Sequence, residues 1–365
     1  MFTLSSILAK HFTKEIHVET QPLFRGSPRW SSWLGARAWR GARAWARMVW
    51  SSHRALALVT AASGLLLAVS LGLGLLDGRQ VGGAPVWMKP AKFGASVAAM
   101  APVLAWIVGQ MTGPRARRAR RAGTVIAVVA AFELVVISVQ AARGVPSHFN
   151  NATRIDAALF ACMGAAITVL WLAQLAVAVW SFRQPFATPA RTWAIRLGLV
   201  ASLAGGAVGF AMSRPTSGQI ASLHAGRPAP MLGAHAVGVP DGGPGLPVTR
   251  WSADGGDLRV PHFIGLHALQ ILPLAAWLVE RRRRRSAGAP AVVALGASWI
   301  GLIVATLAQA LRGRPLTSLD AAVEIALAAV LLSLAALTSR SAATRAPIAR
   351  PARWPGSAPA RIDLR

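Results

Sequence analysis

Residues 55–76 read ALALVTAASGLLLAVSLGLGLL, an unbroken apolar stretch without a charged side chain. A helix needs about 20 apolar residues to cross a hydrocarbon core about 30 Å thick. Further stretches of the same character follow it along the chain, and together they predict an all-α bundle of about eight membrane-spanning helices. The predicted spans are residues 55–76, 91–111, 123–142, 156–180, 193–213, 262–279, 289–311 and 319–338.

The composition supports a membrane protein and excludes several other classes. Hydrophobic residues make up 54% of the chain and charged residues only 14%, whereas soluble proteins carry roughly 25% charged residues. The net charge of +27 comes from arginines that lie between the apolar stretches. Because they form no separate basic domain, we predict no nucleic-acid binding. The single cysteine, Cys162, excludes a disulfide within the chain, a CxxC zinc site and a CxxCH haem attachment.

The arginines also predict the orientation. Short loops that hold many positive residues stay on the cytoplasmic side. The loops after the second, fourth and sixth spans are the basic ones, so both ends of the chain are expected in the cytoplasm. The residues concerned are Arg115, Arg117, Arg118, Arg120, Arg121, Arg183, Arg191 and Arg281 to Arg285. Arginine outnumbers lysine by 35 to 4, which is typical of a GC-rich genome and predicts a bacterial inner (plasma) membrane protein.

We expect three parts: a cytoplasmic segment 1–54, a spanning domain 55–338 and a disordered basic tail 339–365. Within the first part, the arginines of residues 30–50 fall on one side of a helical wheel and apolar residues, Trp30 and Trp45 among them, fall on the other. This predicts an amphipathic helix lying on anionic lipid headgroups. The repeat GARAW at 35–39 and 41–45 has a period of six residues, so low complexity is the alternative. Reversing the charge of several arginines here should weaken binding to anionic lipid.

One extracytoplasmic loop, residues 214–260, is much longer than the others and holds nine glycines and six prolines. Loops beyond about 15 residues are usually functional or disordered. Trp251 and the apolar run PGLPV at 244–248 favour a lid folded onto the helix ends. The Asp-Gly-Gly sequences at Asp241 and Asp254 lack the spacing of a calcium loop and indicate turns.

Polar side chains inside the predicted spans gather in their outer halves, beneath this loop. Ionisable groups at such positions are costly and usually face a partner or a wet cavity. We therefore predict a pocket open to the outside that binds a small ligand, with Glu133 as a proton or cation site if transport occurs. The alternative is structural pairing, such as Asp156 with Arg154 or Lys92 with Glu324. The predicted ligand-binding residues are Lys92, Glu133, Gln140, Asp156, His267, Gln270, Asp320 and Glu324.

Histidines on the outer side suggest a second chemistry. His148 follows the third span, while His262 and His267 open the sixth. These three are candidate ligands of a metal or haem, with His267 paired across helices to His148 or His235. Because His262 and His267 lie about 140° apart around a helix, they do not readily bind one metal together. Ordinary hydrogen-bonded histidines are the alternative.

The run PVWMKPAKF at 85–93 places Trp87 and Lys89 at the outer interface. This is either an aromatic and basic anchor or a cationic rim for an anionic ligand. The chain contains no GxSxG, Walker A, HExxH or GxGxxG motif, so an ordinary hydrolase or NTPase is not expected.

Four stretches resemble a set found in uncharacterised multi-pass membrane proteins of GC-rich bacteria. They are PVWMKPAKF (85–93), SHFNNATRIDAALF (147–160), DGGPGLPVTRW (241–251) and GGDLRVPHFIGLHALQ (255–270). The resemblance implies a bacterial inner-membrane protein without assigned catalytic residues. Three hypotheses follow: ligand binding or transport, a haem- or metal-binding redox protein, and a non-catalytic structural or signalling subunit.

Overall fold

The computed structural model describes residues 29–282 and 288–338. The predicted tail 339–365 lies outside them. Within this part of the chain, seven helices are long and apolar enough to cross a membrane. They are α2 (Arg54–Leu76), α3 (Met88–Gly109), α4 (Gly113–Arg143), α5 (Arg154–Phe182), α6 (Pro189–Met212), α8 (Arg259–Arg282) and α9 (Ala289–Leu311). The predicted eighth span is the shorter apolar helix α10 (Ala321–Thr338). The all-α polytopic bundle is thus confirmed.

The chain divides into two compact units, residues 1–47 and 48–365. Helix α1 (Arg29–Ser52) covers the predicted interfacial segment 30–50 and confirms that it is helical. The side chains of α1 up to Arg40 lie outside the described residues, so its lipid-facing surface stays a prediction. The rest of the fold belongs to the second unit.

Local capping fixes where several spans begin and end. The Thr153 and Thr188 side chains accept hydrogen bonds from the backbone N–H groups of Asp156 and Arg191, both at 3.1 Å, and so start α5 and α6. Such caps satisfy N–H groups that lack a partner within the helix. Helix α4 ends at Gly144, whose φ of 73° is a left-handed conformation favoured by glycine.

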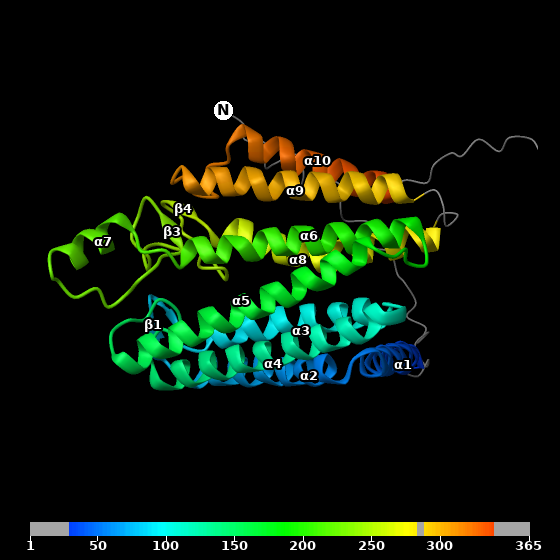
Figure 1. The fold of residues 1–365 in the computed structure, drawn as a ribbon, viewed down its shortest axis with the longest axis horizontal. Coiled ribbons are helices and arrows are strands. Elements are labelled where there is room, and N and C mark those ends of the chain that lie inside the picture. Colours follow the sequence, from blue (N-terminus) through cyan, green and yellow to red (C-terminus); the bar gives the residue numbers. More distant parts are fainter. Residues whose placement is uncertain (1–28, 283–287, 339–365) are drawn as a thin grey trace, which may run out of the picture. The chain divides into compact units, whose positions relative to one another are not determined.

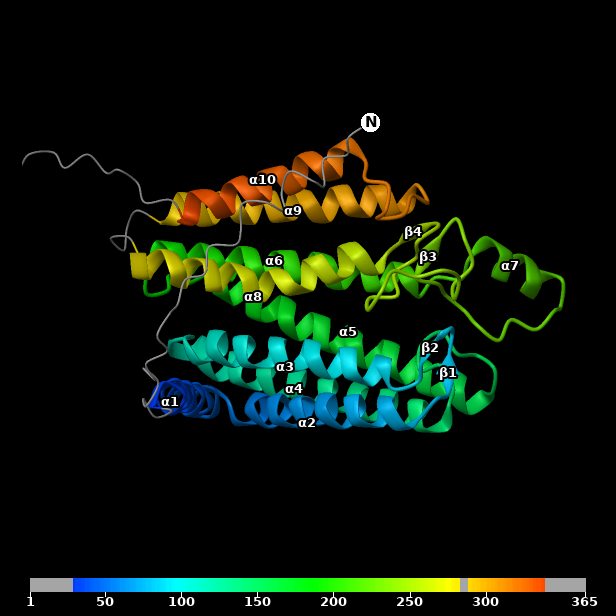
Figure 2. The ribbon, with the colours of Figure 1, turned by 180° about the vertical axis from the view of Figure 1, so that it is seen from behind.

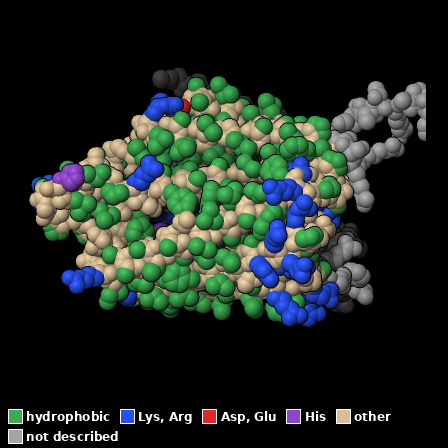
Figure 3. Space-filling view, viewed as in Figure 1, with side chains coloured by type: hydrophobic (Ala, Val, Ile, Leu, Met, Phe, Trp, Pro, Cys, Tyr) green, Lys and Arg blue, Asp and Glu red, His purple; other side chains and the backbone are tan. Residues whose placement is uncertain are grey.

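The second unit contains two groups of helices joined by α5. Helices α2, α3 and α4 lie together, and so do α6, α8, α9 and α10, while α5 crosses diagonally from the first group to the second (Figures 1 and 2). Successive helices alternate in direction, so the arginine-rich loops share one end, here called the basic end (Figure 3). The long loop lies at the other end, here called the loop end.

Helices α6 and α8 approach most closely where two glycines face each other. A Cβ atom on Gly265 would lie 2.5 Å from the Cα atom of Gly205. Small residues at a crossing let two backbones pack tightly, which drives helix association in membranes. This crossing lies about two turns from the loop end of α6 and fixes the position of the first turns of α8.

The long loop is folded and packs onto the helix ends, as predicted for a lid. We call residues 213–258 the cap. It contains the short helix α7 (Ser217–His224) and two antiparallel strands, β3 (Ala236–Val237) and β4 (Gly256–Asp257). A second small hairpin, β1 (Gln80–Val81) with β2 (Ala84–Pro85), connects α2 to α3 at the same end.

Candidate ligand-binding site at the loop end

The two helix groups share an apolar core only in the halves near the basic end. There, Ile195, Leu199 and Leu203 of α6 and Leu269 of α8 join the same buried cluster as residues of α2, α3 and α4. At the loop end, directly under the cap, Phe149 packs with Val208 and Met212 of α6. A set of charged and imidazole side chains in this part of the chain interact electrostatically with one another. We call them the polar layer: Lys89, Glu133, His148, His235, His262 and Arg259.

Lys89, in the first turn of α3, is the central cation of the polar layer. It keeps partial exposure although the chain surrounds it closely. Its nearest opposite charge is Glu133 of α4, and Arg259 of α8 adds a like charge nearby. Among the described residues, its ammonium group makes no hydrogen bond or ion pair. Charged groups away from bulk water are normally paired, so the Lys89 ammonium group is available to bind an anionic ligand.

Glu133 supplies the buried carboxylate of the polar layer. The residue is only 5% exposed, and its Oε1 atom has no hydrogen-bond partner within the described structure. It interacts electrostatically with Lys89, yet no ion pair within 4 Å joins the two. A buried polar atom without a partner costs about 1–3 kcal/mol. Lys89 and Glu133 are therefore both incompletely paired within the described structure.

Three imidazoles complete the polar layer, and each is held through its Nδ1 atom. His262 Nδ1 lies 2.7 Å from the Gly205 carbonyl oxygen, and His235 Nδ1 lies 2.8 Å from a carboxylate oxygen of Asp241. Because these partners only accept, Nδ1 carries the proton and Nε2 of the neutral ring is an acceptor. His148 Nδ1 lies 3.1 Å from the Ser147 hydroxyl. All three histidines are partly exposed as residues.

Burial keeps the histidines outside the helices neutral. It lowers the pKa of His148 well below its ordinary value, and the charges of Lys89, His235 and His262 act in the same direction. Burial also lowers the pKa of His235, although the hydrogen bond to Asp241 opposes it. For Asp241 itself, burial raises the pKa, but the His235 ring and two backbone N–H groups outweigh it and bring the pKa to about 2.

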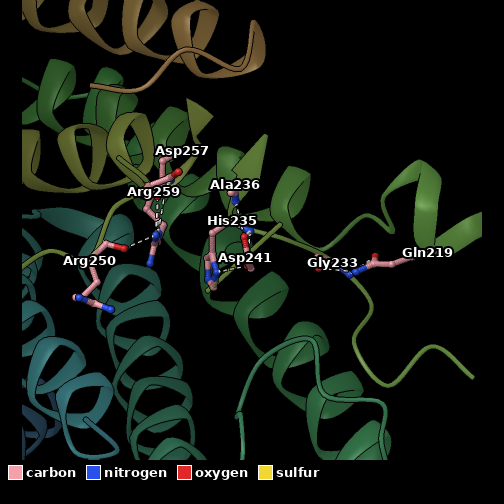
Figure 4. A network of polar contacts seen from close by, with 9 residues as sticks. Gln219, Gly233, His235, Ala236, Asp241, Arg250, Asp257 and Arg259 are labelled. Atoms are coloured by element: carbon pink, nitrogen blue, oxygen red, sulfur yellow. Dashed lines mark hydrogen bonds and ion pairs between the residues drawn. The ribbon is translucent and has the colours of Figure 1, made fainter. Parts of the chain in front are cut away.

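The cap holds His235 through the network in Figure 4. Asp241 accepts hydrogen bonds from the backbone N–H groups of His235 and Ala236 as well as from the ring, at 2.7 to 3.0 Å. In a neighbouring network, Arg259 binds Asp257 at 2.5 Å and the Arg250 carbonyl oxygen at 2.7 Å. The predicted turn at Asp241 is therefore also the anchor that orients a histidine of the polar layer.

The predicted ligand-binding residues fall into separate places. Gln140 and Asp156 do meet: the Gln140 amide donates to Asp156 at 2.9 Å, and Arg143 pairs with the same carboxylate at 2.7 Å. Asp156 is thus paired with Arg143 and not, as the structural alternative had it, with Arg154. The Lys92 ammonium donates to the Thr249 carbonyl oxygen at 2.8 Å, so the suggested pairing of Lys92 with Glu324 is wrong.

The remaining predicted residues belong to α8 and α10. Asp320 forms ion pairs with Arg312 and Arg314 beside α9. Glu324 is exposed on α10. The His267 ring packs at a tilt against the Phe263 ring, with ring centroids 4.1 Å apart, and the Gln270 amide nitrogen donates to the His267 carbonyl oxygen at 3.0 Å. Of the eight predicted residues, Glu133 is the one that lies in the polar layer.

Among the described residues, no group of three or more histidine, cysteine or acidic side chains is placed to hold a metal ion. The predicted set His148, His262 and His267 therefore does not form such a group in this structure. His262 and His267 interact only weakly through charge, as their angular separation on α8 suggested. His148, in the α4–α5 connection, and His262, on α8, interact electrostatically.

Sequence reasoning did not place Lys89, His235 and Arg259 in one site. Lys89 was noted only as an interfacial residue with a possible role in anion binding, and the two others lie in or beside the long loop. Their meeting depends on how the cap folds over α3 and α8. No protein-family model, curated protein or solved structure matches this chain significantly.

Proposed function

We propose that this multi-pass membrane protein binds a small anionic molecule in the polar layer, with the Lys89 ammonium as the principal contact. The supporting observation is that Lys89 is enclosed by the chain and, in the described structure, has no hydrogen-bond or ion-pair partner. A charged group that is enclosed away from bulk water is normally paired. An oxyanion beside Lys89 would replace the lost hydration and neutralise the charge.

The surrounding charges favour an anion over a cation. Lys92 and Arg250 both donate to backbone carbonyl oxygens, at 2.8 and 2.6 Å, so neither positive charge is neutralised by these bonds. Arg259 is paired with Asp257. The Nε2 atoms of His235 and His262 add hydrogen-bond acceptors. A ligand that carries both an anionic oxygen and an O–H or N–H donor would satisfy these groups together.

The arrangement of the two helix groups is compatible with transport. Their apolar core closes the half near the basic end, while polar side chains separate them toward the loop end. Alternating access needs two groups that rock about a central site. In that reading, the loop end faces outward and the protein lies in a bacterial plasma membrane. Glu133 would exchange a proton during the cycle, so Glu133→Gln should insert normally but fail to transport.

Thermal unfolding in mild detergent tests anion binding without knowledge of the natural ligand. The melting temperature is measured in inorganic phosphate and in chloride at equal ionic strength. Binding to the folded state alone adds about 2.7 kcal/mol at a hundredfold excess over Kd. We expect phosphate to stabilise the wild type and Arg183→Met, which removes an exposed cation at the basic end. Lys89→Met should lose the effect. Equal stabilisation of Lys89→Met would refute the proposal.

A haem- or metal-binding protein is the second candidate. It is favoured by the Nδ1 bonds of His235 to a carboxylate and of His262 to a carbonyl oxygen, since metal-binding imidazoles are commonly oriented in this way. Two such rings on facing segments would suffice as axial ligands of haem. Purified protein should then show a Soret band or bound metal. A colourless, metal-free sample that still binds phosphate would leave only the anion site.

A further inference from the structure

The cap closes the loop end of the bundle over the polar layer. Its backbone bonds to the α4–α5 connection, where Asn151 N–H donates to the Pro230 carbonyl oxygen and Leu232 N–H to that of Phe149, both at 2.8 Å. On the opposite side, the Arg250 guanidinium donates to the Gly83 carbonyl oxygen of the β1–β2 hairpin at 2.6 Å. A ligand that comes directly from water at the loop end therefore meets folded backbone on both sides of the polar layer.

The side of the bundle is open where α5 diverges from α6. The two helices are joined about halfway along their length, where the Trp171 ring N–H donates to the Leu203 carbonyl oxygen at 3.0 Å. At the loop end, Phe160 of α5 meets Phe149, with ring centroids 5.6 Å apart. Gly164 lies between Phe160 and Trp171 on the same face of α5, because residues four and seven apart share a helix face. A Cβ atom on Gly164 would have nothing within 4 Å.

The opposing face of α6 is also cut back by glycine. Gly206 lies against Trp171, and a Cβ atom on Gly209 would lie 3.3 Å from the Cε1 atom of the His262 ring. The Trp171 ring therefore packs on Gly206, and the His262 ring packs on Gly209. Figure 3 shows the molecular surface hollowed between the loop-end halves of α5 and α6. We call this gap, which is bordered by Gly164 and Gly209 and closed by the Trp171 ring at Gly206, the lateral opening.

The rim of the lateral opening is apolar and faces the bilayer. Ile167 of α5 and Phe210 of α6 are 40% and 38% exposed beside it. Behind the rim, the His148 ring lies 6.2 Å from that of Phe160, and His148 interacts electrostatically with Lys89 and His262. An apolar entrance with imidazoles and an ammonium group behind it matches a molecule that has an acyl chain and an anionic headgroup.

We infer that the polar layer takes the anionic headgroup of a membrane amphiphile, which enters from the bilayer between α5 and α6. This inference rests on the proposed function, because it assigns the Lys89 site to the headgroup. The headgroup oxygens lie beside Lys89, the imidazole Nε2 atoms accept from a headgroup hydroxyl, and the acyl chain lies along Phe210 and Ile167. The buried Oε1 atom of Glu133, which has no hydrogen-bond partner in the described structure, could accept a hydrogen bond from a headgroup hydroxyl.

Filling the lateral opening tests this route. Gly164→Trp places an indole in space that is now free, and it replaces a glycine that weakens the helix. Gly72→Trp is the matched control, because a Cβ atom at Gly72 on α2 also has nothing within 4 Å. Each variant is purified in nanodiscs of phosphatidylcholine with a minor fraction of phosphatidic acid. Native mass spectrometry then counts the bound phosphatidic acid, with phosphatidylcholine as the neutral comparison.

The wild type and Gly72→Trp should retain phosphatidic acid in preference to phosphatidylcholine, whereas Gly164→Trp and Lys89→Met should lose about tenfold in occupancy ratio, equivalent to about 1.4 kcal/mol. Stabilisation of Gly164→Trp by inorganic phosphate should persist. Unchanged retention in Gly164→Trp, or equal retention of both lipids by the wild type, would overturn the inference. Stabilisation by phosphate without retention of phosphatidic acid would overturn it and leave the proposed function standing; failure of both would reject both.

Discussion

Replacing Gly265 by alanine perturbs the crossing that positions His262 at the site. The added Cβ atom would lie 2.5 Å from the Gly205 Cα atom, whereas ordinary contact begins at 3.4 Å. The atoms nearest this Cβ belong to the backbone of Gly205 and Ala201 and not to a flexible side chain. Helices α6 and α8 must therefore separate by about 0.9 Å locally. Overpacking of this kind costs about 1–3 kcal/mol. We therefore expect a lower melting temperature for Gly265→Ala.

Gly301→Ala serves as the control for the general effect of removing a helical glycine. A Cβ atom on Gly301 of α9 would have nothing within 4 Å, and replacing glycine by alanine in a helix gains about 0.5–1 kcal/mol where space allows. Thermal unfolding in the same detergent compares the two variants. Equal melting temperatures would refute the close packing of α6 on α8.

The same variant gives a second readout at the site. The hydrogen bond between His262 Nδ1 and the Gly205 carbonyl oxygen is 2.7 Å long and favours the tautomer that carries its proton on Nδ1. Separating the helices weakens this bond, so the tautomer protonated on Nε2 also becomes populated. Nitrogen-15 NMR of labelled histidine reports the tautomer directly. The wild type should show the Nδ1-protonated form for this ring, and Gly265→Ala should show a mixture. An unchanged spectrum would contradict the link between the crossing and the site.

Three further predictions concern the polar layer and its supports. Lowering the pH below about 6.5, the ordinary histidine value, should destabilise the wild type, because burial lowers the pKa of His148 and only the unfolded chain takes up that proton; His148→Phe should flatten this pH dependence of the melting temperature, whereas replacing the exposed His224 should not. Asp156→Asn should cost about 1–3 kcal/mol in thermal unfolding, since it weakens a buried hydrogen-bonded network, and the exposed Asp254→Asn should cost nothing measurable. Gly256→Ala should loosen the cap, because its Cβ atom would overlap a backbone carbonyl oxygen of α9; hydrogen exchange of the cap amides should rise, and unchanged exchange would show that the cap is not seated there.

Hydropathy located the spans well because it measures what the bilayer requires. The predicted span 55–76 corresponds to α2 at Arg54–Leu76, and 156–180 corresponds to α5 at Arg154–Phe182. The largest difference is in α4, which begins at Gly113 rather than at residue 123. Its first turns hold the arginines of the basic end, which form helix readily although they lie outside the apolar part. Hydropathy therefore marks the membrane and not the end of a helix.

The candidate site was only partly predictable for a different reason. Glu133 was identified because an acidic residue deep in an apolar stretch is conspicuous in any sequence. The pairing of Asp156 with Arg143 depends on the turn that Gly144 makes after α4, and no spacing rule gives it. His235 reaches the polar layer only because Asp241 folds the cap back on itself. Contacts that depend on loop conformation and on helix rotation are not encoded in local periodicity.

The most direct test of a headgroup site behind the lateral opening is a cryo-electron microscopy map of the protein in nanodiscs that contain phosphatidic acid. The account predicts elongated density between α5 and α6 at Gly164, continuous with a headgroup peak beside the Lys89 ammonium. A map in which side chains fill the space at Gly164, with Lys89 and Glu133 in a direct ion pair and no further density, would contradict it.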